Sequence, residues 1–261
     1  MDNPKVSVIT VVYNSKDLFT RTLESIKNLK YSNKEVIVID GGSTDGTKEV
    51  IERNSLYINT WISERDKGIY DAMNKALRLA TGEYVWFINA GDYPFSPHIL
   101  ENIFKGREVY ADIYYGETLI INDEGDILGL RKKKLPKKLT ANTFLDGMVV
   151  CHQSFIAKKK ILRPFDTRYK HSADYDQMIK AVKMAKSTYK VNGAVSVFAE
   201  GGHTEKNRMA GLKERYRIMK HYFGTFRTIL AHITIALKSP FRHYRKYKGP
   251  PPVFPKQPHN G

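Results

Sequence analysis

The first ninety-five residues alternate between short runs of β-branched and apolar residues and longer segments in which apolar residues recur with the helical period. The short runs predict strands, because β-branched side chains favour extended backbone. The expected strands are residues 5–13, 34–40, 59–64 and 84–89, and the expected helices between them are residues 15–29, 41–54 and 68–82. Strand–helix alternation at this spacing predicts an α/β fold with a doubly wound, mostly parallel sheet.

Turn and cap residues sharpen some of these boundaries. Ser15 is expected to cap the first helix, Ser43 or Thr44 the second, and Gly82 to follow the end of the third. After residue 95 the pattern is less regular. It predicts a helix starting at Ser96, strands within 111–130, a helix over 173–185, two short strands within 189–202, and a disordered proline-rich tail over 249–261.

Polar or acidic side chains follow all four strands of the first ninety-five residues. In an open parallel sheet, ligands bind beyond the carboxyl ends of the strands, so these side chains are expected to meet at one edge. The candidates, strand by strand, are Thr10, Tyr13 and Asn14; Asp40; Glu64 and Asp66; and Asn89, Ala90, Gly91 and Asp92. Four polar strand ends together predict a ligand site, although each alone is also what an ordinary loop would show.

The residue types at these strand ends indicate the kind of ligand. Carboxylates favour a divalent cation, and hard oxygen ligands suit Mg²⁺ or Mn²⁺, which in turn favour a diphosphate. Glycines at 41, 42, 46 and 91 would let backbone approach a ligand closely. None of the glycine runs has the spacing of a dinucleotide-binding loop or a P-loop, which argues against a dehydrogenase and a P-loop NTPase.

The chain of 261 residues carries a net charge of +16, which predicts an anionic partner: nucleic acid, a membrane surface or a phosphorylated substrate. Twelve Lys and Arg residues against two acids lie between Glu205 and Lys248, and a second basic cluster occupies residues 131–138. The single cysteine, Cys151, fits a reducing compartment, and the N-terminal sequence lacks the features of a secretory signal.

Four stretches in the first half resemble the family 2 glycosyltransferases with the GT-A fold, most closely those that build bacterial surface polysaccharides: VSVITVVYNSKDLFTRTLESI, EVIVIDGGSTDGT, SERDKGIYDAMNKAL and TGEYVWFINAGD. The resemblance continues more thinly through HQSFIAKK, SADYDQMIKA and FAEGGHT. It implies transfer of a sugar, with inversion, from a nucleoside-diphosphate-sugar (a UDP-sugar for preference) to a glycan or a polyprenyl-diphosphate-linked acceptor in polysaccharide biosynthesis.

The resemblance also implies roles for individual residues. Thr10, Tyr13 and Asp40 would hold the base and ribose, with Glu64 and Asp66 beside the nucleotide and Asn74 near the diphosphate; Asn14 and the 89–91 turn would complete the nucleotide-sugar site. Asp92 would be the surviving acid of the metal motif, with His203 as a second ligand or a phosphate contact. Asp174 would be the catalytic base, and His152 and Gln153 would contact the acceptor or the sugar.

The sequence departs from the commoner family pattern, because Asn89 and Gly91 stand where acids often occur. Several residues also have simpler explanations. Asp40 could cap the helix that follows it, and Asp174 lies in a first helical turn, where the helix dipole favours any acid. Asp176 is expected to be a solvated or capping acid, and His152 and Gln153 could be core polar groups whose hydrogen bonds are satisfied internally.

The basic segment 211–248 has an apolar centre, Phe226 to Leu237, which is too short to cross a bilayer. Its flanking cations predict a helix that lies in the interface of an anionic membrane; the alternative is a helix packed on the protein's own core. The expected division is residues 1–95 for the nucleotide-sugar, 96–204 for the acceptor and catalysis, 205–248 as a basic helical membrane-associating segment, and the 249–261 tail.

Two other functions compete with the glycosyltransferase hypothesis. A Mg²⁺-dependent nucleotidyltransferase would also use acids at strand ends, but it usually has an early glycine-rich basic loop, which this sequence lacks. A basic nucleic-acid-binding protein would carry its charge along a groove, whereas here the strand ends are acidic, so no nucleic-acid partner is expected. The expected location is the cytoplasm, peripherally attached to the inner face of the cell membrane; the sequence predicts no oligomeric state.

Overall fold

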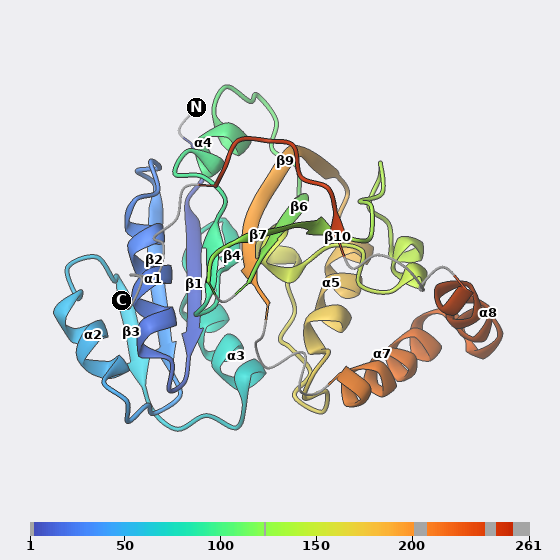
Figure 1. The fold of residues 1–261 in the computed structure, drawn as a ribbon, viewed down its shortest axis with the longest axis horizontal. Helices are drawn as coiled ribbons and strands as arrows, with labels where there is room; N and C mark the ends of the chain where they lie inside the picture. Colours follow the sequence, from blue (N-terminus) through green and yellow to red (C-terminus); the bar gives the residue numbers. More distant parts are fainter. Residues whose placement is uncertain (1–2, 123, 201–207, 238–243, 253–261) are drawn as a thin grey trace.

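The computed structural model describes residues 3–122, 124–200, 208–237 and 244–252, and its centre is one mixed β-sheet (Figure 1). The N-terminal half supplies four parallel strands in the order β3-β2-β1-β4. They are β1 (Val6–Val12), β2 (Lys34–Asp40), β3 (Thr60–Ser63) and β4 (Tyr84–Phe87), connected by the helices α1 (Lys16–Lys27), α2 (Thr47–Arg53) and α3 (Ile69–Leu79). The predicted α/β class and the parallel order of these strands are confirmed.

Alternate residues of the central strands bury their side chains on opposite faces of the sheet, because successive side chains of a strand point in opposite directions. On β1, Val6, Val8 and Val12 join the core formed with α1, α2 and α4 (Ile99–Phe104). Ile9 and Val11 join the core formed with α3 on the other face. Both faces of the parallel half are therefore covered, as a doubly wound sheet requires.

The C-terminal half extends the same sheet, mostly with antiparallel strands. Beyond β4 the order continues β8-β6-β7-β10, while β9 pairs with β6 in parallel and with β5 in antiparallel direction. These strands are β5 (Asp92–Pro94), β6 (Ile113–Ile121), β7 (Ile127–Arg131), β8 (Phe155–Lys158), β9 (Thr188–Ala199) and β10 (Tyr244–Arg245). The remaining elements here are the 3-10 turns η1 (Ala141–Asp146), η2 (His152–Ser154) and η3 (Lys159–Ile161) and the helix α5 (Ala173–Met184).

Three local expectations differ from the structure. Neither Ser15 nor Ser43 caps a helix with its side chain; instead the carboxylate of Asp45 accepts the backbone N–H groups of both Lys16 and Thr47, at 2.9 and 3.1 Å, so one acid serves the starts of two helices. The two short strands expected within 189–202 are one strand, β9, whose register with β6 shifts near Gly116. Asp92 does not simply end a strand, because it begins β5.

The basic C-terminal segment forms two helices and a strand rather than one helical stretch to residue 248. The helices α7 (Arg208–Phe223) and α8 (Thr225–Leu237) lie at the end of the molecule opposite α2 and β3 (Figure 1). Ile218 and Met219 of α7 are buried in the core around α5, as the alternative of a helix packed on the protein predicts. Tyr244 and Arg245 pair with β7 as β10. No helix in the described part of the chain is long and apolar enough to span a membrane.

Candidate active site

The turn that follows β4 is held from α1 by one hydroxyl group. Thr22 is fully buried; its side-chain oxygen accepts the N–H of Gly91 at 2.9 Å and donates to the carbonyl of Asp92 at 3.0 Å. The N–H of Asp92 closes the turn on the carbonyl of Asn89 at 2.9 Å, and Gly91 adopts a φ of +97°, which favours glycine. The turn that carries Asn89 and Asp92 is therefore fixed before any ligand binds.

The two oxygen-bearing side chains of this turn have different surroundings. Asp92 is 5% exposed, and its carboxylate accepts the amide of Gln153 at 2.8 Å. Burial raises the pKa of Asp92 to about 7, although the Gln153 amide and the backbone N–H of Asn89 oppose that rise. The side-chain oxygen of Asn89 is buried without a hydrogen-bond partner, and Asn89, unlike Asp92, is among the residues that line a cavity of about 480 Å³. Asn89 is thus the more direct contact for a ligand.

Asp174, the expected catalytic base, lines the same cavity from the first turn of α5. Its Oδ1 atom accepts the Tyr70 hydroxyl at 3.0 Å and the backbone N–H of Tyr175 at 2.9 Å. Tyr70 is contributed by α3, 104 residues earlier in the chain, and burial strongly raises the pKa of its phenol, with the Asp174 charge adding to the effect. Tyr70 therefore stays protonated and fixes the orientation of the Asp174 carboxylate, a role that the sequence did not reveal.

His152 and Gln153 form the wall between the β4 turn and Asp174. His152 is buried, stacks on Phe87 with 5.0 Å between ring centroids, and lines the cavity. Burial lowers its pKa, against the opposing charge of Asp174, so the ring is neutral near pH 7. Gln153 lines the cavity while donating to Asp92 and accepting the Cys151 thiol at 2.9 Å. Gln153 is thus a core polar group with internal hydrogen bonds, His152 is held by ring contacts, and both residues line the cavity; their contact with the acceptor or the sugar stays a prediction.

Asp40 sits at the end of β2 with no exposed surface. Its carboxylate accepts the backbone N–H of Ser43 at 3.1 and 3.2 Å, the Ser43 hydroxyl, and the Ser63 hydroxyl at 2.6 Å. This is the turn geometry that the simpler explanation predicts, and it also holds the acid in one orientation. Asn14, at φ 43°, accepts the N–H of Thr44 at 2.8 Å through its side-chain oxygen, so the loops after β1 and β2 support each other.

Thr10 and Tyr13 lie at the end of β1 with opposite exposure. Thr10 is buried and donates to the carbonyl of Ile88 at 2.7 Å, which ties β1 to the end of β4. Tyr13 is 63% exposed, and a side chain at Gly41 would lie 3.2 Å from its ring. The open ring face of Tyr13 above the Gly41 backbone is suited to stacking with a base, whereas Thr10 acts through the backbone it holds.

Lys75 of α3 gathers the acids that follow β3. Its ammonium lies 2.7 Å from Glu64, 2.5 Å from Asp66 and 3.8 Å from Asp71. Burial raises the pKa of Asp66, and its contact with Lys75 opposes this shift. The strand-end acids are therefore partly neutralised by a lysine that the sequence did not single out, and they form a hydrogen-bonding surface rather than a cation site.

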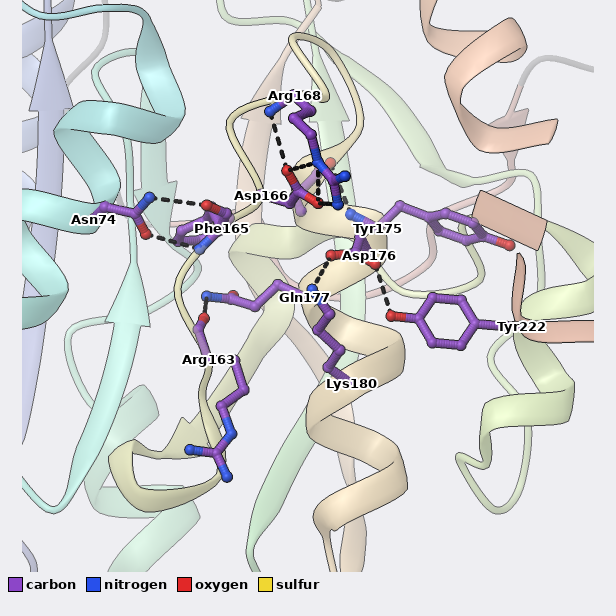
Figure 2. A network of polar contacts seen from close by, with 11 residues as sticks. Asn74, Arg163, Phe165, Asp166, Arg168, Tyr175, Asp176, Gln177, Lys180 and Tyr222 are labelled. Atoms are coloured by element: carbon purple, nitrogen blue, oxygen red, sulfur yellow. Dashed lines mark hydrogen bonds and ion pairs between the residues drawn. The ribbon is translucent and has the colours of Figure 1, made fainter. Parts of the chain in front are cut away.

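Asn74 and Asp176 have structural contacts that differ from the expectations (Figure 2). The side chain of Asn74 donates to the carbonyl of Phe165 at 2.9 Å and accepts its N–H at 2.7 Å, so both ends of the amide hold the segment before α5. The expectation that Asp176 is a solvated or capping acid is wrong: it is 3% exposed and binds Lys180 at 2.6 Å and the Tyr222 hydroxyl at 2.7 Å. Asp176 therefore connects α5 to α7.

The residues of the turn after β4 can provide only a few ligands for a divalent cation. No three His, Cys, Asp or Glu side chains gather into a metal-binding group within the described residues, and His203 lies outside them. The partnerless oxygen of Asn89 and the carboxylate of Asp92 are hard oxygen donors, as Mg²⁺ and Mn²⁺ prefer, although Asp92 is 5% exposed, accepts the Gln153 amide and does not line the cavity. The donor set fits a cation that takes most of its ligands from a diphosphate and water.

Solved structures with the same arrangement define the class of protein: this is a GT-A fold. *Staphylococcus aureus* TarS, residues 1–349, matches with a TM-score of 0.66 at 19% identity, over 90% of this chain and 73% of that chain. The mannosyltransferase PcManGT from *Pyrobaculum calidifontis*, in complex with GDP-Man and Mn²⁺, matches with a TM-score of 0.61 at 20% identity, over 92% and 77%. At these identities the likeness establishes the fold alone.

The family follows from the sequence itself. The model of glycosyl transferase family 2 matches residues 7–164, and the chain belongs to this family. One relative is the *Escherichia coli* UDP-Glc:alpha-D-GlcNAc-diphosphoundecaprenol beta-1,3-glucosyltransferase WfgD, 28% identical over 184 residues, which are 70% of this chain and 72% of WfgD. Another is a PGL/p-HBAD biosynthesis glycosyltransferase of *Mycobacterium bovis*, 26% identical over 69% of this chain and 70% of that protein. The resemblance in the sequence motifs is confirmed, and the protein is a glycosyltransferase.

Proposed function

We propose that the protein transfers a sugar, with inversion, from a UDP-sugar to a polyprenyl-diphosphate-linked acceptor in surface-polysaccharide biosynthesis. The observation that carries this proposal is the single cavity that Asp174 shares with Asn89 and Gln153. A base thereby faces the strand end where the donor's diphosphate is expected. The name of WfgD supports the lipid-linked acceptor, and a TarS structure in complex with UDP-GlcNAc supports the donor class.

The residues of the cavity suggest how each would act. Asp174 would take the proton of the acceptor hydroxyl as that oxygen attacks the anomeric carbon, while Tyr70 holds the carboxylate in place. The acceptor oxygen and the departing diphosphate lie on opposite sides of that carbon in a single displacement, so the anomeric configuration inverts. A Mg²⁺ or Mn²⁺ ion held by Asn89 and Asp92 would neutralise charge on the departing diphosphate.

The nucleotide would occupy the ends of β1, β2 and β3. Tyr13 offers an open ring face, Asp40 presents its carboxylate in a fixed orientation, and Glu64 remains 57% exposed beside Lys75. The glycines after β2 let the ligand approach the backbone, as at Gly42, whose φ is +81°. Residues 1–95 would therefore bind the donor, and residues 96–204 would supply the base and the acceptor side.

The helix α8 supports peripheral attachment to an anionic membrane. Its residues Phe226, Ile229, Leu230, Ile233 and Leu237 recur with helical spacing on one face and are 46–80% exposed. Exposed cations lie on the same two helices: Lys213, Arg217 and Lys220 on α7, and Arg227 on α8. An exposed apolar face together with exposed cations matches the interface of a bilayer with negatively charged headgroups. Residues 205–248 would thus combine a helix packed on the protein, a membrane-facing helix and a strand of the sheet.

The direct test is a transfer assay with a short-chain lipid-diphosphate-GlcNAc acceptor and a series of UDP-sugars, with Mg²⁺ or Mn²⁺. We expect a disaccharide product whose new linkage has the opposite anomeric configuration to the donor by NMR, and release of UDP. Release of pyrophosphate from a nucleoside triphosphate with a sugar phosphate would instead favour the nucleotidyltransferase hypothesis. Retention of configuration would contradict the single displacement.

A further inference from the structure

Positive charge is confined to one side of the cavity. Five cationic side chains line it: Arg131, Lys132, Lys133, Lys170 and Arg215. The lining residues from the N-terminal half, Ile69, Tyr70, Met73 and Asn89, carry no charge, and the only lining acids are Asp174 and Glu200. The Glu200 carboxylate accepts the Tyr244 hydroxyl. The wall beyond Asp174, formed by the end of β7, the loop after it and the start of α7, is therefore strongly electropositive.

Arg131 shows that this wall is built to hold its charge in place. One guanidinium nitrogen donates to the carbonyl of Met148 at 3.1 Å, and the other, Nη1, is buried without a hydrogen-bond partner. A buried donor without a partner is costly, so its presence at a cavity indicates a missing acceptor. The Arg131 carbonyl accepts Nε of Arg245 at 2.8 Å, so β10 fixes the end of β7 that carries this residue.

The position of the cations points to the acceptor rather than the donor. The donor's nucleotide is expected at the ends of β1, β2 and β3, and the cavity reaches that side only through uncharged residues. The acceptor hydroxyl must reach Asp174, which lines the same cavity as both sets of residues. An anionic group on the cationic wall would therefore belong to the molecule that donates the hydroxyl.

The cationic wall also borders α8. A side chain at Gly147 would lie 2.8 Å from the ammonium of Lys133 and 3.9 Å from Ile235 of α8. An acceptor with its phosphates on this wall could therefore direct a hydrocarbon chain along α8, whose outer face exposes Ile229, Leu230 and Ile233. Along the protein, the base is followed by the cations and then by the apolar helix. A lipid-linked sugar has the matching order of groups: the hydroxyl, the diphosphate and then the lipid.

We infer that Arg131, Lys132, Lys133, Lys170 and Arg215 form the binding site for the diphosphate of a lipid-linked acceptor. This inference rests on the proposed function, because it assigns the second substrate of the same cavity. Arginine would form paired hydrogen bonds to phosphate oxygens, while the lysines would contribute point charges. The site gives selectivity for acceptors that carry phosphate next to the sugar.

The test compares two triple variants of equal charge. Lys132→Gln/Lys133→Gln/Lys170→Gln changes three cavity-lining lysines, and Lys134→Gln/Lys137→Gln/Lys138→Gln changes three exposed lysines of the same basic cluster that do not line the cavity. The probes are farnesyl diphosphate and UDP, each titrated by calorimetry. We expect the first variant to weaken farnesyl diphosphate at least about tenfold, since hydrogen bonds to charged groups are the strong ones. The control should change it less than about twofold, with UDP affinity unchanged in both, because exposed charges act weakly.

Three results would overturn the inference. Equal weakening of farnesyl diphosphate binding in both variants would indicate an effect of bulk charge alone, and loss of UDP affinity instead of farnesyl diphosphate affinity would assign the cations to the donor. The third such result is that the unmodified protein does not bind farnesyl diphosphate. Kinetics separate this inference from the proposed function. If the first variant transfers sugar with an unchanged KM for the acceptor, the inferred diphosphate site is wrong and the proposed function still holds. If the protein binds farnesyl diphosphate selectively but transfers no sugar, the inferred diphosphate site still holds and the proposed function is wrong.

Discussion

At the scale of single residues, Asp174 and Asp176 have the same side chain in the same helix but different surroundings. Asp174 faces the cavity, whereas Asp176 is buried against Lys180 and Tyr222 (Figure 2). We predict that Asp174→Asn lowers kcat by about 10²–10⁴-fold, the usual contribution of a general base, with little change in stability. The measurement is steady-state transfer together with urea unfolding.

Asp176→Asn should show the reverse pattern. Asp176 is buried but Lys180 is 33% exposed, so loss of this charged partner should lower the free energy of unfolding by about 1–3 kcal/mol. The protein that remains folded should keep its kcat, because Asp176 does not line the cavity. If Asp176→Asn instead lost kcat at full stability, the assignment of the base to Asp174 would be wrong.

Asn89 permits a test of the cation at the same scale. Asn89 lines the cavity and its side-chain oxygen is buried without a partner, so a carboxylate at this position would add charge beside the cavity. We predict that Asn89→Asp binds Mn²⁺ without nucleotide at least about tenfold more tightly than the unmodified protein, because carboxylates are the ligands such cations prefer. Calorimetric titration with Mn²⁺ measures this directly. Asn192→Asp, on an exposed part of β9, adds the same charge elsewhere and should have no effect.

At the scale of elements, α8 provides a further prediction. Replacing Ile229, Leu230 and Ile233 with Gln should weaken binding to vesicles of phosphatidylglycerol and phosphatidylcholine at least about a hundredfold, because each buried aliphatic side chain contributes about 1.5–3 kcal/mol. Stability should change little, since these side chains are exposed in the protein. Sedimentation with vesicles measures the loss. Leu56→Gln, which alters a residue that is 96% exposed at the other end of the molecule, is the control.

The sequence predicted long regular elements well and short ones poorly. The strands β1 and β2 and the helices α1, α3 and α5 follow from long apolar runs or the helical period, and β4 follows from the apolar run 84–88, which is longer than the strand itself. The strands β5 and β8 have three and four residues, too few for a period, and β10 has two. These strands exist because β9, β4, β6 and β7 offer them a neighbour. Pairing between distant segments has no local signature, so the C-terminal half could not be derived in detail.

At the scale of the whole molecule, Glu35 holds together the edge opposite the active site. Its buried carboxylate accepts the backbone N–H of Thr81 at 2.6 Å and of Gly82 at 3.0 Å, and it lies 2.8 Å from the ammonium of Lys5. Burial alone would raise the pKa of Glu35, but hydrogen bonds from Lys5, Ser7 and Thr81 outweigh it and lower the pKa to about 2. One side chain thus joins β1, β2 and the approach to β4.

The lowered pKa gives a pH-dependent prediction. The stabilisation from ionised Glu35 is present above pH 4.5, its ordinary pKa, and is lost as the pH falls from there toward 2. We expect Glu35→Gln to lower the free energy of unfolding by up to about 3 kcal/mol at pH 7, with a difference that narrows below pH 4.5. Urea unfolding between pH 3.5 and 7 measures it. A difference that stays constant across this range would show that packing, and not charge, is responsible.

The sequence predicted the candidate-site residues that directly follow a strand or lie in a family motif. It missed the residues whose role depends on partners distant in the chain. Asn89, Gln153 and Asp174 all line the cavity, as strand ends and motif resemblance indicated. Tyr70 and Thr22 gave no signal, and Arg131 stood out only as part of the basic cluster 131–138, because each acts on a residue or element far away in the chain; the Tyr70–Asp174 bond spans 104 residues. A tyrosine in a helix is usually core, so only the folded structure distinguishes this one.

The α7–α8 hairpin is attached to the body on both sides: Ile218 and Met219 of α7 are buried in the core, and Tyr244 and Arg245 pair with β7. If α8 lies on a membrane, these attachments of α7 and β10 to the body would hold Asp174 at a constant height and tilt above the bilayer. The enzyme would then act as a ruler. Acceptors whose reactive sugar lies at that distance from the bilayer would be substrates. A glycan that already extends beyond this distance would not be. The distance from the lipid, rather than recognition of each sugar, would then limit the length of the product.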